Sequence, residues 1–283
     1  MKLVILGTKG GPRLSNERSS PAQVVLVGDR VIVIDCGEGV PHRLVKAGIA
    51  LDSVSDVLIT HHHSDHNGSY GNLLLMAWAS GLTTSIRVFG PPPIVEMTDA
   101  FFVLNAFDIE CRIADEGRMP LRPMVHVTEM SHSGTVLEED GVIVRAAIVQ
   151  HPPVEPSFAF RIDAEGHSVV ISGDTVPCDA LVALARGADV LVHEVMHPDY
   201  LEDLIRSRNA NTDWTRMRNH MFRSHTSVND VGAVAEAAGV KTLVLSHLVP
   251  GDPEVPERAW VDPVCKRFSG SVVLGYDLLE INL

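Results

Sequence analysis

The stretch ITHHHSDHNG concentrates four histidines and an aspartate in six consecutive positions, beginning at His61. It follows the apolar run DVLIT, which has the length and composition of a buried strand. On an extended backbone, side chains two positions apart point to the same side, so His61 and His63 can reach one ion whereas His62 points away. Imidazole and carboxylate donors together suit zinc, and also manganese, iron or cobalt. A solvated histidine-rich loop is the alternative, but the preceding strand favours a metal site.

Two ions need more donors than this stretch provides. Asp65 and His66 come at the start of a predicted helix and can face a second ion. Three further candidates each end a predicted strand: His151 follows VRAAIVQ, Asp174 follows VVISG, and His247 follows TLVLS. Ligand groups collect at strand ends in α/β proteins, and a carboxylate such as Asp174 can bridge two cations. We therefore expect one ion at His61, His63, His151 and Asp174, a second at Asp65, His66, Asp174 and His247, and a hydroxide between them.

Apolar runs of strand length alternate with helical periods along all 283 residues. The pattern shows no linker and no fixed repeat, which predicts one α/β domain over residues 1–283. The strands cluster in two halves, and each half is expected to form a sheet packed against the other, with helices outside. The segment at about 91–135 is the hardest to assign, and we expect an insert that forms a lid or a dimer contact. Within it, FFVLNAF at 101–107 is expected to be helix core, with the wall of an apolar pocket as the alternative.

The charge balance limits the partners. Lysine and arginine total 23 against 36 acidic residues, for a net charge of −13. This balance disfavours nucleic acid, whose binding normally needs a basic surface. A small anionic ester is still compatible, because a bound metal pair makes its site locally positive.

The cysteines and apolar runs indicate the compartment. The four cysteines are widely spaced and contain no CxxC pair, which argues against a disulfide framework and a zinc finger. No run approaches about 18 apolar residues, so we predict no membrane span. The cytoplasm is the default location, with a removed leader as the alternative.

Seven short motifs occur along the chain: DCGEG at 35–39, THHHSDH at 60–66, QHPP at 150–153, SGDT at 172–175, HEV at 193–195, SHTS at 224–227 and LVLSH at 243–247. In this order they resemble the motifs of the metallo-β-lactamase superfamily, and more finely its ribonuclease Z and arylsulfatase-like branch. The resemblance implies a four-layer αβ/βα sandwich of two mixed β-sheets flanked by helices, with the ions at one edge. It also supports the ligand set proposed above.

The resemblance also implies catalytic roles. A water bridging two divalent cations loses a proton near neutral pH and attacks a phosphorus, sulfur or carbonyl centre. By the resemblance, Asp65 is the general base, and Glu194 pairs with His225, which protonates the leaving group. A neighbouring carboxylate fixes the tautomer of an imidazole and raises its basicity. The alternative is that His225 merely caps the following helix and Glu194 is a salt-bridge partner.

The chain departs from ribonuclease Z in one place that affects the substrate. That family inserts a long arm that grips tRNA, whereas here only RIDAEGHSV joins SFAF to VISGDT. We therefore expect a hydrolase of a small ester, first a phosphodiester, with a sulfate ester, a carboxylic ester or a lactone as alternatives. tRNA 3′-end processing is disfavoured. The resemblance suggests a homodimer, in contact through 91–135 or 199–223.

Other classes fit less well. A di-iron redox protein of the same fold would need electron-transfer machinery such as a flavin domain, and the sequence shows none. A dioxygenase would use a mononuclear metal site, and the full set of donors for a second ion argues against it. A non-catalytic scaffolding protein would be expected to have lost some of the metal ligands, and all of them are present here. Asp35 ends a strand and is expected to hydrogen-bond a ligand histidine from outside. His197 and His220 are candidates for the pocket wall, but no pattern fixes their position.

Overall fold

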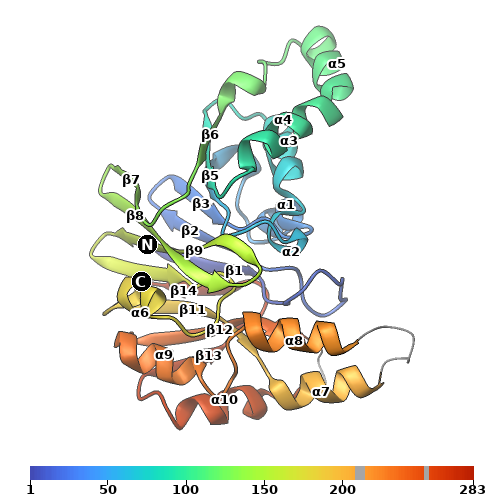
Figure 1. The fold of residues 1–283 in the computed structure, drawn as a ribbon. Coiled ribbons are helices and arrows are strands. Elements are labelled where there is room, and N and C mark those ends of the chain that lie inside the picture. The colour runs from blue at the N-terminus through green and yellow to red at the C-terminus, as the bar shows by residue number, and fades with distance from the viewer. Residues whose placement is uncertain (208–213, 252–254) are drawn as a thin grey trace.

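Two seven-stranded sheets form the centre of the molecule (Figure 1). The structure is a computed structural model and describes residues 1–207, 214–251 and 255–283. The first sheet has the order β14-β1-β2-β3-β4-β5-β6, and the second has the order β13-β12-β11-β10-β9-β8-β7. Both are mixed: β3 to β6 run parallel in the first and β10 to β13 in the second, and the other neighbouring pairs are antiparallel.

The strands of the first sheet are β1 (Lys2–Gly7), β2 (Ala22–Val27), β3 (Arg30–Ile34), β4 (Val54–Leu58), β5 (Ile86–Gly90), β6 (Val125–Glu129) and β14 (Leu279–Asn282). Those of the second are β7 (Gly134–Glu139), β8 (Val142–His151), β9 (Val154–Ala164), β10 (His167–Ile171), β11 (Val190–Met196), β12 (Thr242–Val249) and β13 (Ser271–Leu274). The helices are α1 (Val40–Lys46), α2 (Ser64–Asn67), α3 (Tyr70–Ala79), α4 (Ile94–Leu104), α5 (Ala106–Glu116), α6 (Asp179–Ala185), α7 (Pro198–Ser207), α8 (Trp214–Ser224), α9 (Val231–Ala238) and α10 (Glu257–Cys265), with short 3₁₀ turns at η1 (Leu51–Ser53) and η2 (Arg122–Met124).

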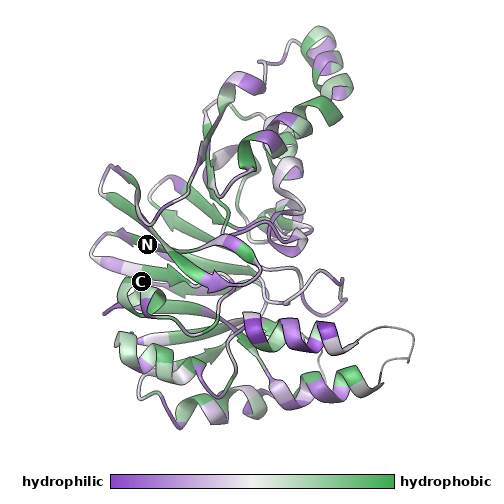
Figure 2. Cartoon of the chain, in the orientation of Figure 1, coloured by the Kyte–Doolittle hydropathy of each residue, from purple (hydrophilic) through white to green (hydrophobic). Residues whose placement is uncertain are grey.

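Side chains along each strand point alternately to the two faces of the sheet, which explains the four layers of helices, sheet, sheet and helices. In β1, Leu3 and Ile5 face the core between the two sheets, whereas Val4 and Leu6 face the core under α1, α3 and α4. The outer face of the second sheet is covered in the same way by α6, α9 and α10. Strands buried on both faces read as continuous apolar runs, and Figure 2 shows the sheets as largely hydrophobic. The expected two-sheet sandwich flanked by helices is confirmed.

The segment at 91–135 holds more regular structure than a loop-rich insert. It forms α4, α5 and β6, and β6 is the edge strand of the first sheet. Helix α5 extends away from the sheets (Figure 1). Phe101 is buried and Phe102 is partly buried against the same core, but the expectation that FFVLNAF is helix core is wrong beyond them. Val103 is 78% exposed, Leu104 84% and Phe107 88%. The role of the segment 91–135 as a lid or dimer contact stays a prediction.

The segment 199–223 is helical where it is described, in α7 and α8, and residues 208–213 lie outside the described residues. Within the described ranges, no helix is long and apolar enough to cross a membrane.

Candidate metal centre

The predicted donors meet at one end of the two sheets. The turn after β4 carries His61 and His63, and α2 carries Asp65 and His66. The second sheet contributes the other three donors: His151 ends β8, Asp174 follows β10, and His247 lies near the end of β12.

The first group of donors consists of three histidines and one carboxylate. His63 Nδ1 lies 3.0 Å from His61 Nε2 and 3.2 Å from His151 Nε2. Asp174 Oδ2 lies 3.9 Å from His61 Nε2 and 3.8 Å from His151 Nε2. Donors bound at about 2.1 Å to one tetrahedral ion are separated by roughly 3.4 Å. This group therefore has the spacing that a zinc-sized ion requires.

The second group shares Asp174 with the first. His247 Nε2 lies 3.4 Å from Asp65 Oδ2 and 3.3 Å from Asp174 Oδ2. His66 Nε2 lies 3.7 Å from Asp65 Oδ2 and 3.3 Å from Asp174 Oδ1. Four buried atoms here have no hydrogen-bond partner: His66 Nε2, Asp174 Oδ1 and both ring nitrogens of His247. Buried polar atoms without partners need an explanation, and a second cation bound by these atoms supplies one.

Two hydrogen bonds orient the donor rings. Asp35 Oδ2 lies 2.7 Å from His66 Nδ1, and the backbone carbonyl of Ser224 lies 2.9 Å from His151 Nδ1. Each acceptor holds the proton on Nδ1 and leaves Nε2 as the metal donor. The expected hydrogen bond of Asp35 to one of the candidate donor histidines is present. Thr60 fixes Asp35 in turn through its backbone N–H and its hydroxyl, at 2.8 and 2.9 Å.

A β-bulge aims His247 at the cluster. In the pairing of β11 with β12, Glu194 is opposite Ser246 but Val195 is opposite Leu248, so His247 is the extra residue. Its φ of 44° is left-handed, a conformation that non-glycine residues adopt at bulges and functional sites. The ring lies so close to Gly10 that a Cβ there would sit 2.8 Å from it. Only glycine fits without a shift.

Burial and neighbouring charge set the protonation of the donors. Burial lowers the pKa of His61 well below its ordinary value and that of His151 to about 4, which favours the neutral, ligating ring. Burial acts in the same direction on His66, but the carboxylates, Asp174 first, raise its pKa above the usual range. The pKa of Asp65 is lowered despite burial, because the neighbouring rings of His66 and then His247 stabilise its anion.

Glu194 and His225 form a buried pair beside the donors. Glu194 Oε1 lies 3.1 Å from His225 Nδ1 and also accepts the backbone N–H groups of Thr175 and Thr226, each at 3.1 Å. Burial lowers the pKa of His225, but Glu194 and then Asp174 raise it to about 9. The ring stacks on that of His247 at 5.7 Å. The cap position of the next helix, α9, belongs to Asp230, so the capping alternative for His225 does not hold.

His220, one of the two candidates for the pocket wall that no sequence pattern placed, lies near the donors. The ring of His220, on α8, lies 6.2 Å from those of His63 and His151. The arrangement of α8 depends on tertiary packing, and no spacing in the sequence signals it. His197 instead packs between Tyr200 and Trp260.

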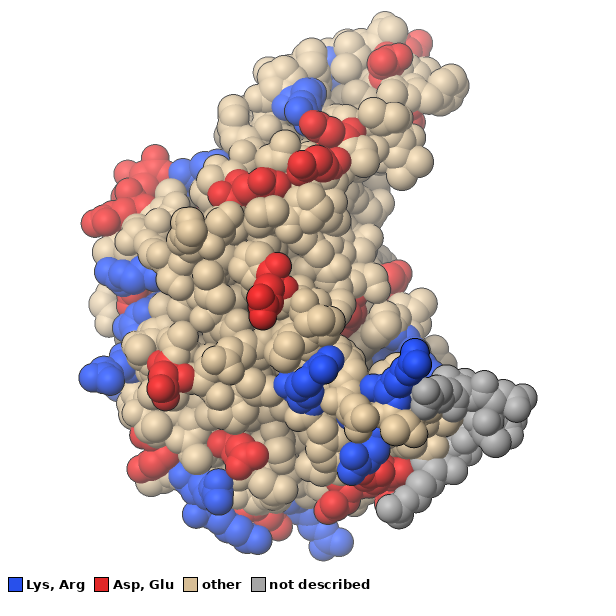
Figure 3. Space-filling model, viewed as in Figure 1, with Lys and Arg blue, Asp and Glu red and all other residues tan. Residues whose placement is uncertain are grey.

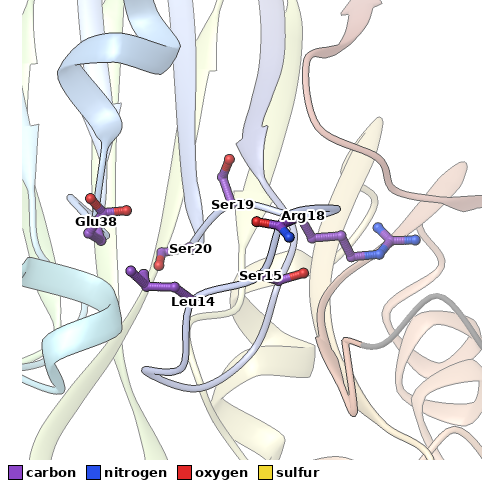
Figure 4. Close-up of a pocket in the computed structure, with 7 residues that line it drawn as sticks. Leu14, Ser15, Arg18, Ser19, Ser20 and Glu38 are labelled. Atoms are coloured by element: carbon purple, nitrogen blue, oxygen red, sulfur yellow. The ribbon is translucent and has the colours of Figure 1, made fainter.

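The loop between β1 and β2 borders the cluster. The backbone N–H of Gly11 donates to Asp65 Oδ2 at 2.9 Å. Farther along, the loop encloses a cavity of about 310 Å³, shown in Figure 4 with Leu14, Ser20 and Glu38 around it. Arg18 extends away from these three side chains and donates to Thr8 Oγ1 at 2.7 Å and to the carbonyl of Gly275 at 3.0 Å. These bonds anchor the loop to the body of the protein.

Known proteins match this chain along its whole length. Residues 30–248 match the family model described as the β-lactamase superfamily domain. Ribonuclease Z of Mycobacterium bovis is 35% identical over 286 aligned positions, which cover 100% of this chain and 98% of the relative.

The expectation that nucleic acid is not a partner is wrong, and these relatives overturn it. The missing arm does not separate the chain from them, because 286 aligned positions already cover 98% of the relative. The net charge was also a poor guide to nucleic-acid binding, since phosphate binding depends on where the basic side chains lie on the surface. Helix α8 carries Arg216, Arg218 and Arg223 and no acidic residue, and Figure 3 shows basic side chains in its region beside a hollow.

Solved structures agree on the fold. Human tRNase Z, short form, superposes with a TM-score of 0.72 at 21% identity, covering 100% of this chain and 99% of that one. Zn²⁺-bound PqqB from Methylobacterium extorquens superposes with a TM-score of 0.69 at 17% identity, covering 100% of both chains. The sheets, the donor groups and the end-to-end match lead to one assignment: the chain belongs to the metallo-β-lactamase superfamily, in its ribonuclease Z branch.

Proposed function

We propose that this protein is a phosphodiesterase that uses two divalent metal ions to cleave RNA, with 3′-extended tRNA precursors as the first substrate to test. The observation that carries the proposal is the meeting of two donor groups at Asp174, next to the buried Glu194–His225 pair. The names of the relatives and of the human structure, Ribonuclease Z and tRNase Z, support RNA as the substrate class.

The residues proposed to hold the ions have the chemistry that zinc prefers, and manganese, iron and cobalt accept the same donors. Two such ions, when bound, lower the pKa of a water nucleophile and neutralise charge on the phosphate oxygens. The first would be held by His61, His63, His151 and Asp174, and the second by Asp65, His66, Asp174 and His247.

Asp65 is suited to be the general base. Its side chain is only 5% exposed, and the backbone N–H of Gly11 holds one carboxylate oxygen in place. The lowered pKa keeps the carboxylate ionised, so one of its oxygens can accept a hydrogen bond from the attacking water and orient it as the proton leaves.

His225 is suited to be the general acid. Glu194 holds the Nδ1 proton, so the proton that moves is the one on Nε2. It passes to the ribose oxygen that leaves when the P–O bond breaks. An unactivated alkoxide is a poor leaving group, and protonating it in the transition state contributes about 10²- to 10⁴-fold.

The test is cleavage of a 3′-extended tRNA precursor by the metal-loaded protein, with Asp65→Ala as the inactive variant and His62→Ala as the matched control. We expect cleavage by wild type and control and none by Asp65→Ala. If the wild type leaves the RNA intact but hydrolyses bis-nitrophenyl phosphate, RNA is not the substrate and the enzyme acts on small diesters. If neither compound is cleaved, the phosphodiesterase proposal is wrong.

A further inference from the structure

A cavity of about 380 Å³ lies between the β1–β2 loop and helices α7 and α8. No part of the proposed reaction uses it. Its lining consists of the loop residues Lys9 to Ser15, the helix residues Leu201, Leu204, Ile205, Trp214, Met217 and Met221, and the residues Val249 to Gly251 at the end of β12.

This cavity shares a wall with the metal centre. Gly11 lines it and donates its N–H to Asp65 Oδ2. Gly10 also lines it and lies against the ring of His247. On the helix side, the carbonyl of Met221 accepts the backbone N–H of His225 at 3.2 Å. The cavity therefore lies directly beside the donors, next to the position proposed for the substrate phosphate.

The lining combines an aromatic and apolar wall with basic side chains. Trp214 and Met217 present partly exposed apolar surface, and the Arg13 guanidinium lies 6.0 Å from the centre of the Trp214 ring. Lys9 also lines the cavity, and none of the described residues around it is acidic. In a chain of net charge −13, such a lining suits a ligand with a flat apolar part and a negative charge. A nucleotide has both, because single-stranded RNA binds by stacking of bases on aromatic rings and guanidinium planes.

The loop side of this cavity is held in place. Arg18 anchors the loop to Thr8 and Gly275, and the Lys9 ammonium donates to the carbonyl of Gly10 at 2.9 Å. The backbone N–H of Ser19 donates to Asp277 Oδ2 at 2.7 Å. A wall that is fixed before binding loses little conformational entropy when the ligand enters.

We propose that this cavity binds the base of a nucleotide that adjoins the scissile phosphate, with Trp214 stacking on the base and Arg13 facing its phosphate. The inference rests on the proposed function, because it names the part of an RNA substrate that the cavity receives. It makes Trp214 a substrate-binding residue that acts beside the metal centre.

The decisive experiment is a double-mutant cycle between protein and RNA. Precursors with a single abasic residue on the 5′ or the 3′ side of the cleaved bond are compared with the intact precursor, using wild type, Trp214→Ala and Trp214→Phe. We expect Trp214→Ala to raise KM for intact RNA by about 10- to 100-fold, as the loss of one stacked base does, and Trp214→Phe to retain most of the binding. One abasic position should raise KM for wild type and have little further effect in Trp214→Ala.

Additive effects at both abasic positions would overturn the base pocket, since they would mean that Trp214 and the base act independently. A variant that merely misfolds also gives additive losses, together with a lowered melting temperature. RNA cleavage with such additive effects would leave the proposed function intact and remove only the pocket.

A binding measurement tests the cavity without catalysis. Of the three tryptophans, Trp78 and Trp260 are 2% exposed, so Trp214 is the one that a ligand in solution can reach. We expect adenosine 5′-monophosphate to quench the protein fluorescence and ribose 5-phosphate, which lacks the base, to leave it unchanged. Loss of quenching in Trp214→Phe confirms the origin of the signal. Equal effects of the two compounds, or none from either, would contradict the proposal, and quenching in a protein that cleaves no RNA would support the cavity while refuting the ribonuclease function.

Discussion

The donors around the candidate centre come from two unlike regions. His61, His63, Asp65 and His66 lie in one turn and one short helix after β4, and their relative positions follow from the local backbone. His151, Asp174 and His247 come from three different strands of the second sheet, and their positions follow from strand register and from one bulge. The local turn is enough to position the donors of the contiguous motif, whereas the dispersed donors come together only when the whole sandwich has formed. Asp174 links the two regions, because it comes from the second sheet and lies next to His61 and His66 of the contiguous motif.

The largest expected effect comes from removing that meeting point. Asp174→Ala should lower bound metal from about two ions per chain to one or fewer. It should also reduce kcat/KM on the order of 10³-fold or more, because charge stabilisation of several kcal/mol is lost. Metal content by mass spectrometry and RNA cleavage measure the two effects. Asp174→Asn keeps the shape but weakens the ligand, and wild-type metal content in both variants would refute the shared role.

A smaller effect is expected from the general acid, which belongs to the dispersed region. His225→Ala should slow cleavage of RNA by about 10²- to 10⁴-fold, because its leaving oxygen needs a proton. Bis-nitrophenyl phosphate has a good leaving group, so the same substitution should reduce its rate of hydrolysis by a factor at least tenfold smaller. Steady-state rates on both substrates test this prediction. The rate of RNA cleavage by Glu194→Gln is expected to lie between those of wild type and His225→Ala. Equal losses on the two substrates would eliminate the general-acid role.

A substitution at Asp35 tests how far the donors of the contiguous region depend on a hydrogen bond from a residue next to a neighbouring strand. Asp35→Asn removes the charge that orients His66, and outer partners of this kind contribute about 10- to 100-fold to metal affinity. Competition with a chromogenic chelator measures that affinity. Asp163→Asn removes the same charge far from the donors and serves as the control. Equal affinities for the two variants would show that the turn positions His66 without help.

The smallest expected effect falls inside the contiguous motif itself. His62 Nε2 donates to the carbonyl of Pro91 at 2.8 Å, and its Nδ1 accepts from Asn67 Nδ2 at 2.9 Å, so neither ring nitrogen is available to an ion. His62→Ala should keep full metal content and lower the free energy of unfolding by about 1 kcal/mol. His63→Ala, one position on, should lose metal. A loss of metal in His62→Ala would mean that the side-chain alternation inferred for the turn is wrong.

The sequence predicted most of the architecture and the identity of the donor candidates. Strand periodicity, a histidine after a buried strand and single polar residues at strand ends are local signals, and the structure brings the predicted donors together. The exposed end of α4 and the position of His220 were not predictable, because tertiary packing decides which face of a helix is covered. The exclusion of nucleic acid was wrong for a related reason, since total charge does not describe the basic helix α8 beside the site.

The division of the donors between two sheets also couples metal binding to folding. An ion held by His63, in the turn after β4 of the first sheet, and by His151, at the end of β8 of the second, would join segments 88 residues apart and act as a reversible crosslink. Its free energy of binding then adds to the free energy of unfolding, in proportion to the logarithm of free metal concentration. Any affinity that the contiguous motif keeps in the unfolded chain would reduce this gain. Metal supply would then set how stable the sandwich is as well as how active the proposed centre is.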